Sequence, residues 1–173
     1  MRPRLLDLFC GAGGCTKGYQ RAGFYVVGVD VKPQPRYCGD WFVQADALTT
    51  LRNLIYGERN PYALNSYAAI HASPPCQAYS SKTRDKSRHP DLIAPIRELL
   101  EETGLPYVIE NVKGAPLHDP TMLCGSSFGL GVERHRLFET NWPLLVPSCA
   151  HGQQHPRYRV YDHGRWYLSR FVP

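Results

Sequence analysis

The sequence lacks a long hydrophobic segment, and its first residues do not form a secretory signal. A membrane-spanning helix needs roughly 18 consecutive apolar residues, and no run in the chain approaches that length. The start, MRPRLLD, is also too poor in apolar residues for a signal peptide. These two absences predict an intracellular protein that has no membrane partner.

Internal repeats, low-complexity tracts and closely spaced cysteine pairs are also missing. The chain of 173 residues is 43% hydrophobic and 20% charged, which suits one domain with a buried core and excludes a disordered tail. It has six cysteines, but no two of them have the C-x-x-C spacing of many metal and redox sites. We therefore expect free thiols in a reducing compartment.

The positive charge of the chain is small but unevenly distributed. The net charge is +5. Residues 82–90 hold four cations and one acid, and residues 134–173 hold six arginines and two acids. These two basic patches permit a nucleic-acid partner, although a solvated surface explains either patch alone equally well.

Strand-like and helix-like segments alternate over the first two thirds of the chain. This alternation is typical of an α/β fold, with a mostly parallel sheet and helices on both faces. We expect Asp91 to cap the last of the predicted helices. The predicted strands are 4–9, 25–31, 42–45, 68–72 and 107–112, and the predicted helices are 15–22, 48–56 and 91–103.

The pattern changes after residue 112 to loops and short strands, of which 136–140 is the clearest. Residues 143–156 form a polar segment with three prolines, and residues 157–172 have the pattern of a β-hairpin that turns at 162–164. We therefore expect a main domain over residues 1–142, followed by a basic hairpin region over residues 143–173.

A glycine-rich turn, DLFCGAGG, follows the first predicted strand from Asp7 to Gly14. Such a turn lets backbone N–H groups approach a ligand closely, but it matches neither the G-x-G-x-x-G nor the P-loop pattern. Asp30 ends the second strand and Asp46 follows the third, where carboxylates can bind ribose and adenine. A merely tight turn is the alternative. With the two acids in order, a nucleoside cofactor is favoured.

Cys76 lies in the segment SPPCQAYS, directly after the fourth predicted strand. The carboxyl end of a parallel sheet is where α/β proteins bind ligands. Two prolines constrain the chain just before Cys76, and a polar loop is a poor place for a cysteine that only fills space. We therefore expect Cys76 to be a nucleophile rather than a buried structural thiol.

Two further candidates lie on later strands. Glu110 ends the apolar strand in YVIENV, where a carboxylate is costly to bury without a partner. It either caps or ion-pairs at the strand end, or it binds and protonates a substrate. Arg134 and Arg136, in ERHRLFE, are expected to point the same way on a strand, and a pair of surface arginines is the alternative.

Together, DLFCGAGG, PPCQ, ENV and R-x-R resemble the DNA cytosine-5 methyltransferases in order and spacing, over roughly residues 4–140. The resemblance implies a Rossmann-like, S-adenosylmethionine-dependent methyltransferase fold. It implies methyl transfer to C5 of cytosine in DNA, through a covalent bond from Cys76 to C6 of a cytosine flipped out of the duplex. It also implies a restriction-modification setting in the cytoplasm of a bacterium or a phage-infected cell.

The resemblance implies a role for each matching residue. The residues implied in catalysis are Cys76, Glu110, Arg134 and Arg136, with Cys76 as nucleophile and Glu110 holding the cytosine. Those expected to bind the cofactor are Asp7, Phe9, Gly11, Gly13, Gly14, Asp30, Asp46 and Pro75. The resemblance also implies that Gln77 and Asn111 bind DNA. Outside the matching region, Arg157 and Arg159 share one face of a strand of the basic hairpin and are expected to contact DNA phosphates, and no metal is expected.

The chain departs from the family pattern in two places. Val132 stands where the family motif Q-x-R-x-R has its glutamine. Only 33 residues follow Thr140, where family members usually carry a target-recognition region of considerable size and a closing segment. We expect either a compact, phage-type enzyme or a fragment that is completed by a missing segment or a second chain.

Other functions stay open on the sequence. A tRNA cytosine-5 methyltransferase would use the same motifs, and a degenerate module would bind nucleic acid without catalysis. A cysteine hydrolase lacks support, because Cys76 comes with a cofactor loop. Cys149, His151 and His155 invite a zinc site with a distant fourth ligand such as Cys124, but a polar loop is favoured.

Overall fold

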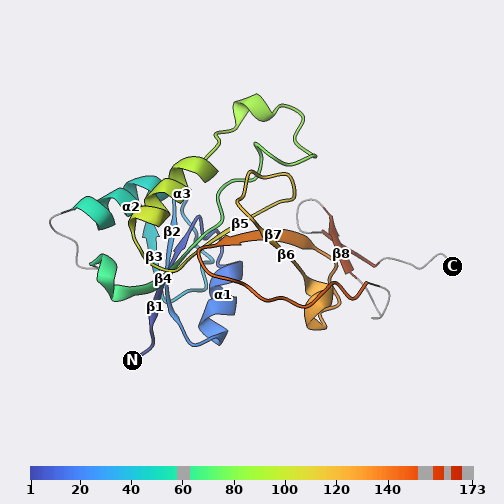
Figure 1. Ribbon diagram of the computed structural model, residues 1–173, viewed down its shortest axis with the longest axis horizontal. Coiled ribbons are helices and arrows are strands. Elements are labelled where there is room, and N and C mark those ends of the chain that lie inside the picture. Colours follow the sequence, from blue (N-terminus) through green and yellow to red (C-terminus); the bar gives the residue numbers. More distant parts are fainter. Residues whose placement is uncertain (58–62, 152–157, 162–164, 169–173) are drawn as a thin grey trace.

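The computed structural model describes residues 1–57, 63–151, 158–161 and 165–168 (Figure 1). Seven strands form one sheet, in the order β3-β2-β1-β4-β5-β7-β6. Their bounds are β1 Arg4–Leu8, β2 Tyr25–Asp30, β3 Trp41–Gln44, β4 Tyr67–Ala72, β5 Tyr107–Asn111, β6 Thr121–Cys124 and β7 His135–Thr140. A separate antiparallel pair consists of β8 Tyr158–Tyr161 and β9 Arg165–Leu168.

The five strands from β1 to β5 run parallel, and β7 is antiparallel to both of its neighbours, β5 and β6. The helices are α1 Gly14–Arg21, α2 Ala47–Tyr56 and α3 Ile93–Glu102, and the short 3-10 segments are η1 Leu64–Ser66, η2 Lys86–Arg88 and η3 Gly125–Phe128. The mostly parallel α/β sheet expected from the sequence is confirmed.

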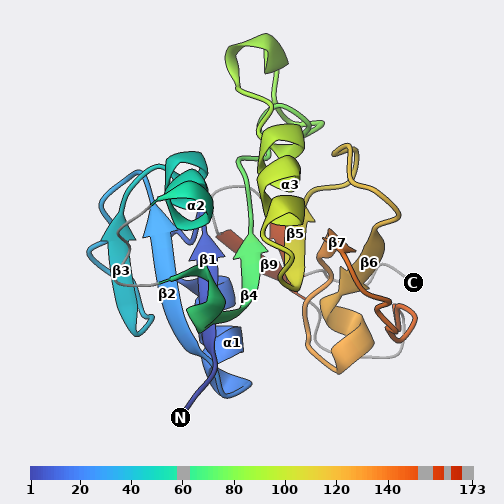
Figure 2. The same ribbon diagram turned by 60° about the vertical axis from the view of Figure 1, so that its left-hand side comes forward.

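Helices cover both faces of the sheet (Figures 1 and 2). α2 and α3 pack side by side on one face, and α1 packs on β1 and β2 from the other. The core under α2 and α3 is continuous because alternate strand residues, such as Leu6 and Leu8 of β1, point to it and meet Leu51 and Leu100 of the helices. Among the described residues, no helix is both long and apolar enough to cross a membrane.

Element boundaries differ slightly from those predicted, and the reasons are local. The helix expected at Asp91 begins at Ile93, although the Asp91 carboxylate still accepts a hydrogen bond of 3.2 Å from the Ile93 N–H. Strand β6 was not predicted, because its four residues have no alternating pattern. The predicted hairpin is confirmed in β8 and β9, while its turn at 162–164 lies outside the described residues.

Candidate active site

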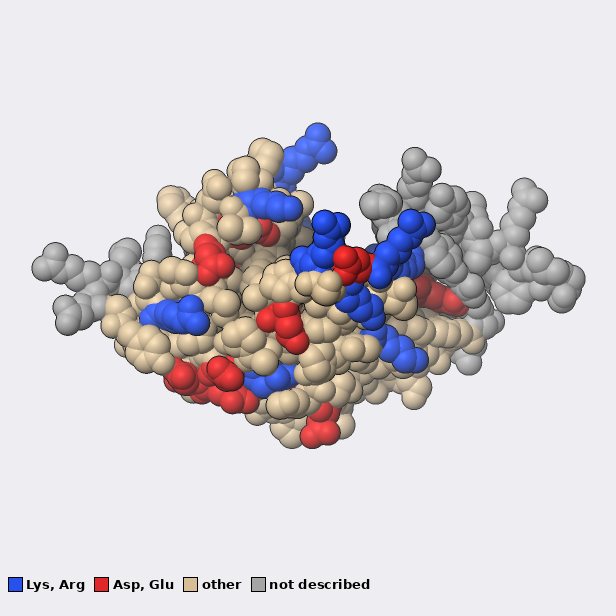
Figure 3. Space-filling model, turned by 90° about the horizontal axis from the view of Figure 1, so that it is seen from above, with Lys and Arg blue, Asp and Glu red and all other residues tan. Residues whose placement is uncertain are grey.

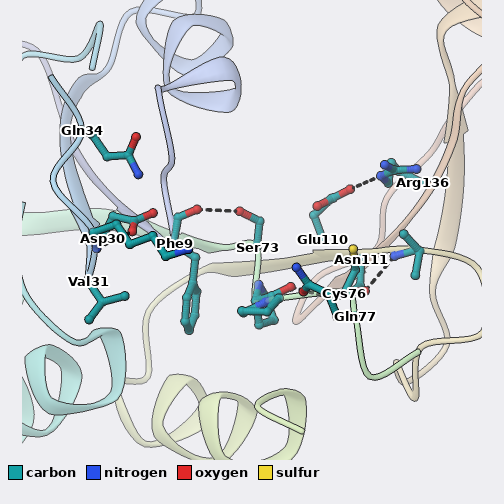
Figure 4. A pocket seen from close by; sticks show the side chains of 14 residues that line it. Phe9, Asp30, Val31, Gln34, Ser73, Cys76, Gln77, Glu110, Asn111 and Arg136 are labelled. Atoms are coloured by element: carbon teal, nitrogen blue, oxygen red, sulfur yellow. Dashed lines mark hydrogen bonds and ion pairs between the residues drawn. The ribbon is translucent and has the colours of Figure 1, made fainter. Parts of the chain in front are cut away.

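The candidate site lies where the chain changes direction across the sheet. From β1 the chain continues to β2 and β3 on one side, while β4 and β5 lie on the other side of β1. The loops after β1 and β4 therefore diverge, which opens a crevice at the carboxyl ends of these strands. A pocket of about 380 Å³ occupies this position (Figure 4). It is lined by Phe9, residues 30–32, Gln34, residues 73–77, residues 110–112 and Arg136.

One half of the pocket is built by the turn after β1 and the end of β2. Phe9 has a left-handed backbone (φ 58°), which is uncommon for a residue with a side chain, and its carbonyl accepts a 3.2 Å hydrogen bond from the Ser73 hydroxyl. The Asp30 carboxylate accepts one hydrogen bond from the Gly11 N–H at 3.0 Å and another from the Lys32 N–H at 2.9 Å. Each oxygen keeps a further lone pair for a ligand.

Asp7 does not line this pocket, although the sequence led us to expect it to bind the cofactor. Its side chain is fully buried beneath the turn, where it accepts a hydrogen bond from the Thr16 hydroxyl of α1. Its other oxygen lies 2.8 Å from Nδ1 of His71, which is also buried. Asp7 therefore ties β1 to α1 and β4 and supports the turn from below.

The glycines of the turn and Asp46 also have mainly structural roles, because the glycines allow the tight turn and Asp46 caps a helix. Gly13 has a left-handed φ of 94°, and a Cβ there would lie 2.8 Å from the Cys38 sulfur, so the turn excludes a side chain at that position. The pocket walls do not include Gly11, Gly13 or Gly14. Asp46 is the N-cap of α2 and accepts a 2.8 Å hydrogen bond from the Thr49 N–H, and it is not a wall residue either. Their direct contact with a cofactor stays a prediction.

The other half of the pocket holds Cys76, a partly exposed free thiol on the loop after β4. The Cys76 carbonyl accepts hydrogen bonds from the Tyr79 and Ser80 N–H groups, which form a turn. Behind the loop, the buried Asn111 amide donates a 2.9 Å hydrogen bond to the Pro74 carbonyl. Asn111 was expected to contact DNA, but its amide oxygen also accepts from the Val112 N–H. In this structure it positions the Cys76 loop.

Glu110 and Arg136 form an ion pair across the neighbouring strands β5 and β7. The distance from Arg136 Nε to Glu110 Oε1 is 2.7 Å, and both side chains are mostly buried. Cys76, Glu110 and Arg136 all line the pocket, and Figure 4 shows the Glu110 carboxylate turned toward Arg136 beside it. The pocket therefore presents a thiol and a carboxyl group to one ligand.

Arg134 was expected to share a strand face with Arg136, but β7 begins only at His135. The pKa of Arg134 is lowered, first by burial and then by the charge of Arg136, while Glu110 and Cys76 act in the opposite direction. Arg134 therefore interacts electrostatically with the charged residues of the site, but it does not line the pocket.

The sequence assigned no role to six residues of the pocket wall. These residues lie within four positions after the ends of β2, β4 and β5, and they are Val31, Lys32, Gln34, Ser73, Pro74 and Val112. Their position after parallel strands is the one signal that could have found them. Lys32 adds a cation beside Asp30 in this wall.

An exposed basic loop follows Cys76. It holds Lys82, Arg84, Lys86 and Arg88, all exposed, and projects beyond α3 at the top of Figures 1 and 2. In this loop, Oδ2 of Asp85 lies 3.8 Å from Nε of Arg88. Figure 3, which looks down on this side, shows lysine and arginine side chains gathered on it. Arg157, expected to bind DNA, lies outside the described residues, and Arg159 is placed only as part of β8.

The chain is similar to methyltransferases in both sequence and structure. The family model described as C-5 cytosine-specific DNA methylase matches residues 3–123. Type II methyltransferase M.AgeI from Thalassovita gelatinovora is 28% identical over 120 residues, covering 64% of this chain and 28% of that protein.

Two solved structures show the same fold. One is a putative DNA modification methyltransferase encoded within an E. coli prophage, with TM-score 0.54 and 23% identity over 79% of this chain and 45% of that one. The other is S. pombe Dnmt2 methyltransferase, with TM-score 0.56 and 18% identity over 84% of this chain and 52% of that one. The expected Rossmann-like methyltransferase fold is thereby confirmed. The chain spans at most about half the length of these relatives.

Proposed function

Because this chain belongs to the C-5 cytosine-specific DNA methylase family, we propose that its pocket transfers a methyl group from S-adenosylmethionine to C5 of cytosine in DNA. One observation carries the proposal. Cys76 and Glu110 line the same pocket as Phe9 and Asp30, so a nucleophile, a carboxyl group and the expected cofactor residues face one space.

The residues of the first half of the pocket fit the cofactor. The Asp30 carboxylate, held at the pocket rim by two backbone N–H groups, has lone pairs that can accept hydrogen bonds from ribose hydroxyls. The Phe9 ring supplies an apolar wall to the same space. When it is bound, S-adenosylmethionine supplies an electrophilic methyl group on a sulfonium.

The residues of the second half fit a cytosine ring. The Cys76 thiolate adds to C6, and the electron pair of the C5–C6 bond moves to C5, which is otherwise a poor nucleophile. Glu110 accepts a hydrogen bond from the exocyclic amine and shares a proton with N3, which stabilises the charge that develops there. C5 then forms a bond to the methyl carbon as the bond from that carbon to the sulfonium sulfur breaks, and S-adenosylhomocysteine leaves. Loss of the C5 proton to water restores the double bond and expels the Cys76 thiolate.

We infer that DNA approaches over the basic loop of residues 82–88. Its four exposed cations directly follow the Cys76 loop, so they can hold phosphates beside the pocket. The target base has to leave the duplex stack to reach Cys76, at a cost of a few kcal/mol. We also propose that the protein acts on DNA in the cytoplasm of a bacterium or a phage-infected cell, and cell fractionation can test this location.

A mechanism-based trap tests the proposal. The full-length encoded protein is mixed with S-adenosylmethionine and a duplex that carries 5-fluorocytosine at the target. Fluorine cannot leave as a cation, so Cys76 stays bonded to C6 and a denaturing gel shows a protein–DNA adduct. Cys76→Ala abolishes the adduct, while the exposed-cysteine control Cys15→Ser keeps it.

Three outcomes contradict the proposal. The nucleophile is misassigned if a cysteine other than Cys76 carries the adduct. The DNA substrate is misassigned if methyl transfer occurs only to RNA oligonucleotides, which would favour a tRNA cytosine-5 methyltransferase. An absence of adduct and of methyl transfer, with S-adenosylmethionine still bound, would indicate a non-catalytic binding module.

A further inference from the structure

Four side chains that play no part in the proposed reaction meet beside the outer edge of the sheet. They are Cys124, His135, Cys149 and His151, and their sulfur and ring nitrogen atoms all lie within 4.8 Å of one another. We propose that this cluster is a structural zinc site with two thiolate and two imidazole ligands. The sequence favoured a polar loop here, because His135 was not recognised as a ligand and Cys124 was distant in the chain.

Strand pairing and a returning loop bring the four side chains together. Cys124 ends β6 and His135 begins β7, and the two residues are direct partners in the antiparallel ladder. Paired residues on such strands project from the same face. The chain then leaves β7 and returns without regular secondary structure to place Cys149 and His151 against this pair. Two ligands thus come from the sheet and two from the loop.

The distances match a tetrahedral zinc site. Zinc binds sulfur at about 2.3 Å and imidazole nitrogen at about 2.0–2.1 Å, so tetrahedral geometry places sulfur and nitrogen ligands about 3.6 Å apart. Here Cys124 Sγ lies 3.3 Å from His151 Nε2, and Cys149 Sγ lies 3.5 Å from His135 Nε2. The ring centroids of the two histidines are 5.0 Å apart. The four ligand atoms all lie within 4.8 Å of one another, so closing the coordination shell needs side-chain movements of up to about 1.5 Å.

The chemistry of the donors also selects zinc. Two thiolates and two imidazoles in a tetrahedral set suit zinc, whereas magnesium and calcium prefer oxygen ligands. The Ser126 hydroxyl lies 3.2 Å from the Cys124 sulfur and can donate a hydrogen bond to it, as outer-shell groups do for metal thiolates.

Four protein ligands leave no open position, so the site would be structural rather than catalytic. It would fasten residues 141–151, which lack helix and strand, to the edge formed by β6 and β7. It would also fix the start of β7, where His135 directly precedes Arg136, the partner of Glu110. The zinc site would therefore stabilise the wall of the pocket without touching the substrate.

Metal analysis of the protein tests the proposal independently of any activity. The protein is produced without a histidine tag, and its metal content is measured by inductively coupled plasma mass spectrometry. We expect about one zinc ion per chain. Replacing zinc with Co²⁺ is expected to give the intense visible absorption bands of a tetrahedral thiolate complex. Removing the metal with a chelator is expected to lower the melting temperature, and zinc is expected to restore it.

Variants locate the metal. His151→Asn changes an exposed ligand and is expected to fold and to lose the zinc, as is Cys149→Ser, even if the buried Cys124→Ser fails to fold. The matched controls Cys15→Ser and His89→Asn, at exposed positions away from the cluster, are expected to keep it. A wild-type protein without bound zinc after incubation with the metal, a Cys124–Cys149 disulfide, or unchanged zinc in both loop variants would each overturn the proposal.

Discussion

The guanidinium of Arg136 on β7 holds the carboxylate of Glu110 on β5, with 2.7 Å between Nε and Oε1. This contact crosses from a parallel strand to the antiparallel strand beside it, and it orients the carboxyl group at the pocket wall. Glu110 would hold the cytosine, so Arg136 is expected to act partly through Glu110.

A double-mutant cycle tests this coupling. Glu110→Gln is expected to slow methyl transfer by about 10²-fold, because it removes a general acid, and Arg136→Ala is expected to slow it as well. The double variant is expected to lose less than the product of the two single losses, because both changes disrupt one interaction. Initial rates with tritiated S-adenosylmethionine measure this. Glu98→Gln, on the exposed side of α3, is the control, and fully multiplicative losses would show that the two residues act separately.

Asp30 is expected to matter for cofactor affinity. Asp30→Ala removes the expected acceptor of the ribose hydroxyls and the anchor of the Gly11 N–H, so S-adenosylmethionine binding is expected to weaken by about 1–3 kcal/mol. Isothermal titration calorimetry measures the affinity.

Asp46→Ala separates the capping role of Asp46 from the cofactor contact that was predicted for it. It removes the N-cap of α2, so it is expected to lower the free energy of unfolding by about 0.5–2 kcal/mol. Equal losses of cofactor affinity in the Asp30 and Asp46 variants would instead support direct contact of both acids with the cofactor.

The buried pair Asp7–His71 is expected to make stability depend on pH. Burial favours the neutral ring of His71, but the hydrogen bond and charge of Asp7 outweigh it, with a smaller effect of Cys15, so the His71 pKa is raised above 6.5. A raised pKa in the folded state contributes stability that is fully present below pH 6.5 and is lost as pH rises through the folded-state value.

Urea unfolding at a series of pH values measures this dependence. Between pH 6.5 and 9.0, the free energy of unfolding is expected to fall by up to about 1.4 kcal/mol per pH unit. Above the ordinary thiol value of 9.0, the raised pKa of Cys10 adds a further loss. His71→Gln is expected to flatten the curve in the lower range. A variant that keeps the wild-type slope would show that His71 is not the titrating group.

The ion pair of Arg97 on α3 with Glu139 on β7 is expected to stabilise the fold strongly. Both side chains are buried, and two hydrogen bonds of 2.6 and 2.8 Å join them. Glu139→Ala leaves a buried guanidinium without its counter-ion, so the free energy of unfolding is expected to fall by about 3–5 kcal/mol. Chemical denaturation measures the loss. In the exposed control Glu98→Ala, the free energy of unfolding is expected to change by no more than about 0.5 kcal/mol. An equally small loss of unfolding free energy in Glu139→Ala would contradict the prediction.

The sequence by itself determined the strands, the helices and the residues at the strand ends. Five of the seven strands of the sheet were predicted within a residue or two before residue 112, and β7 was predicted nearly as it stands. These features depend on neighbours a few positions apart in the chain, so periodicity reveals them. The same local signal predicted that Phe9, Asp30, Cys76 and Glu110 lie at one edge of the sheet, because the carboxyl ends of parallel strands meet there.

Only the tertiary structure decided which side chains meet across strands. It placed Asp7 under the turn instead of in the pocket, turned Asn111 toward the Pro74 carbonyl, and paired Arg136 with Glu110. It also brought His135 beside Cys124 and closed the cluster with two loop residues. Each of these contacts depends on strand order and register, which join residues far apart in the sequence. A sequence pattern does not record that register, because the hydrogen bonds that set it form between strands.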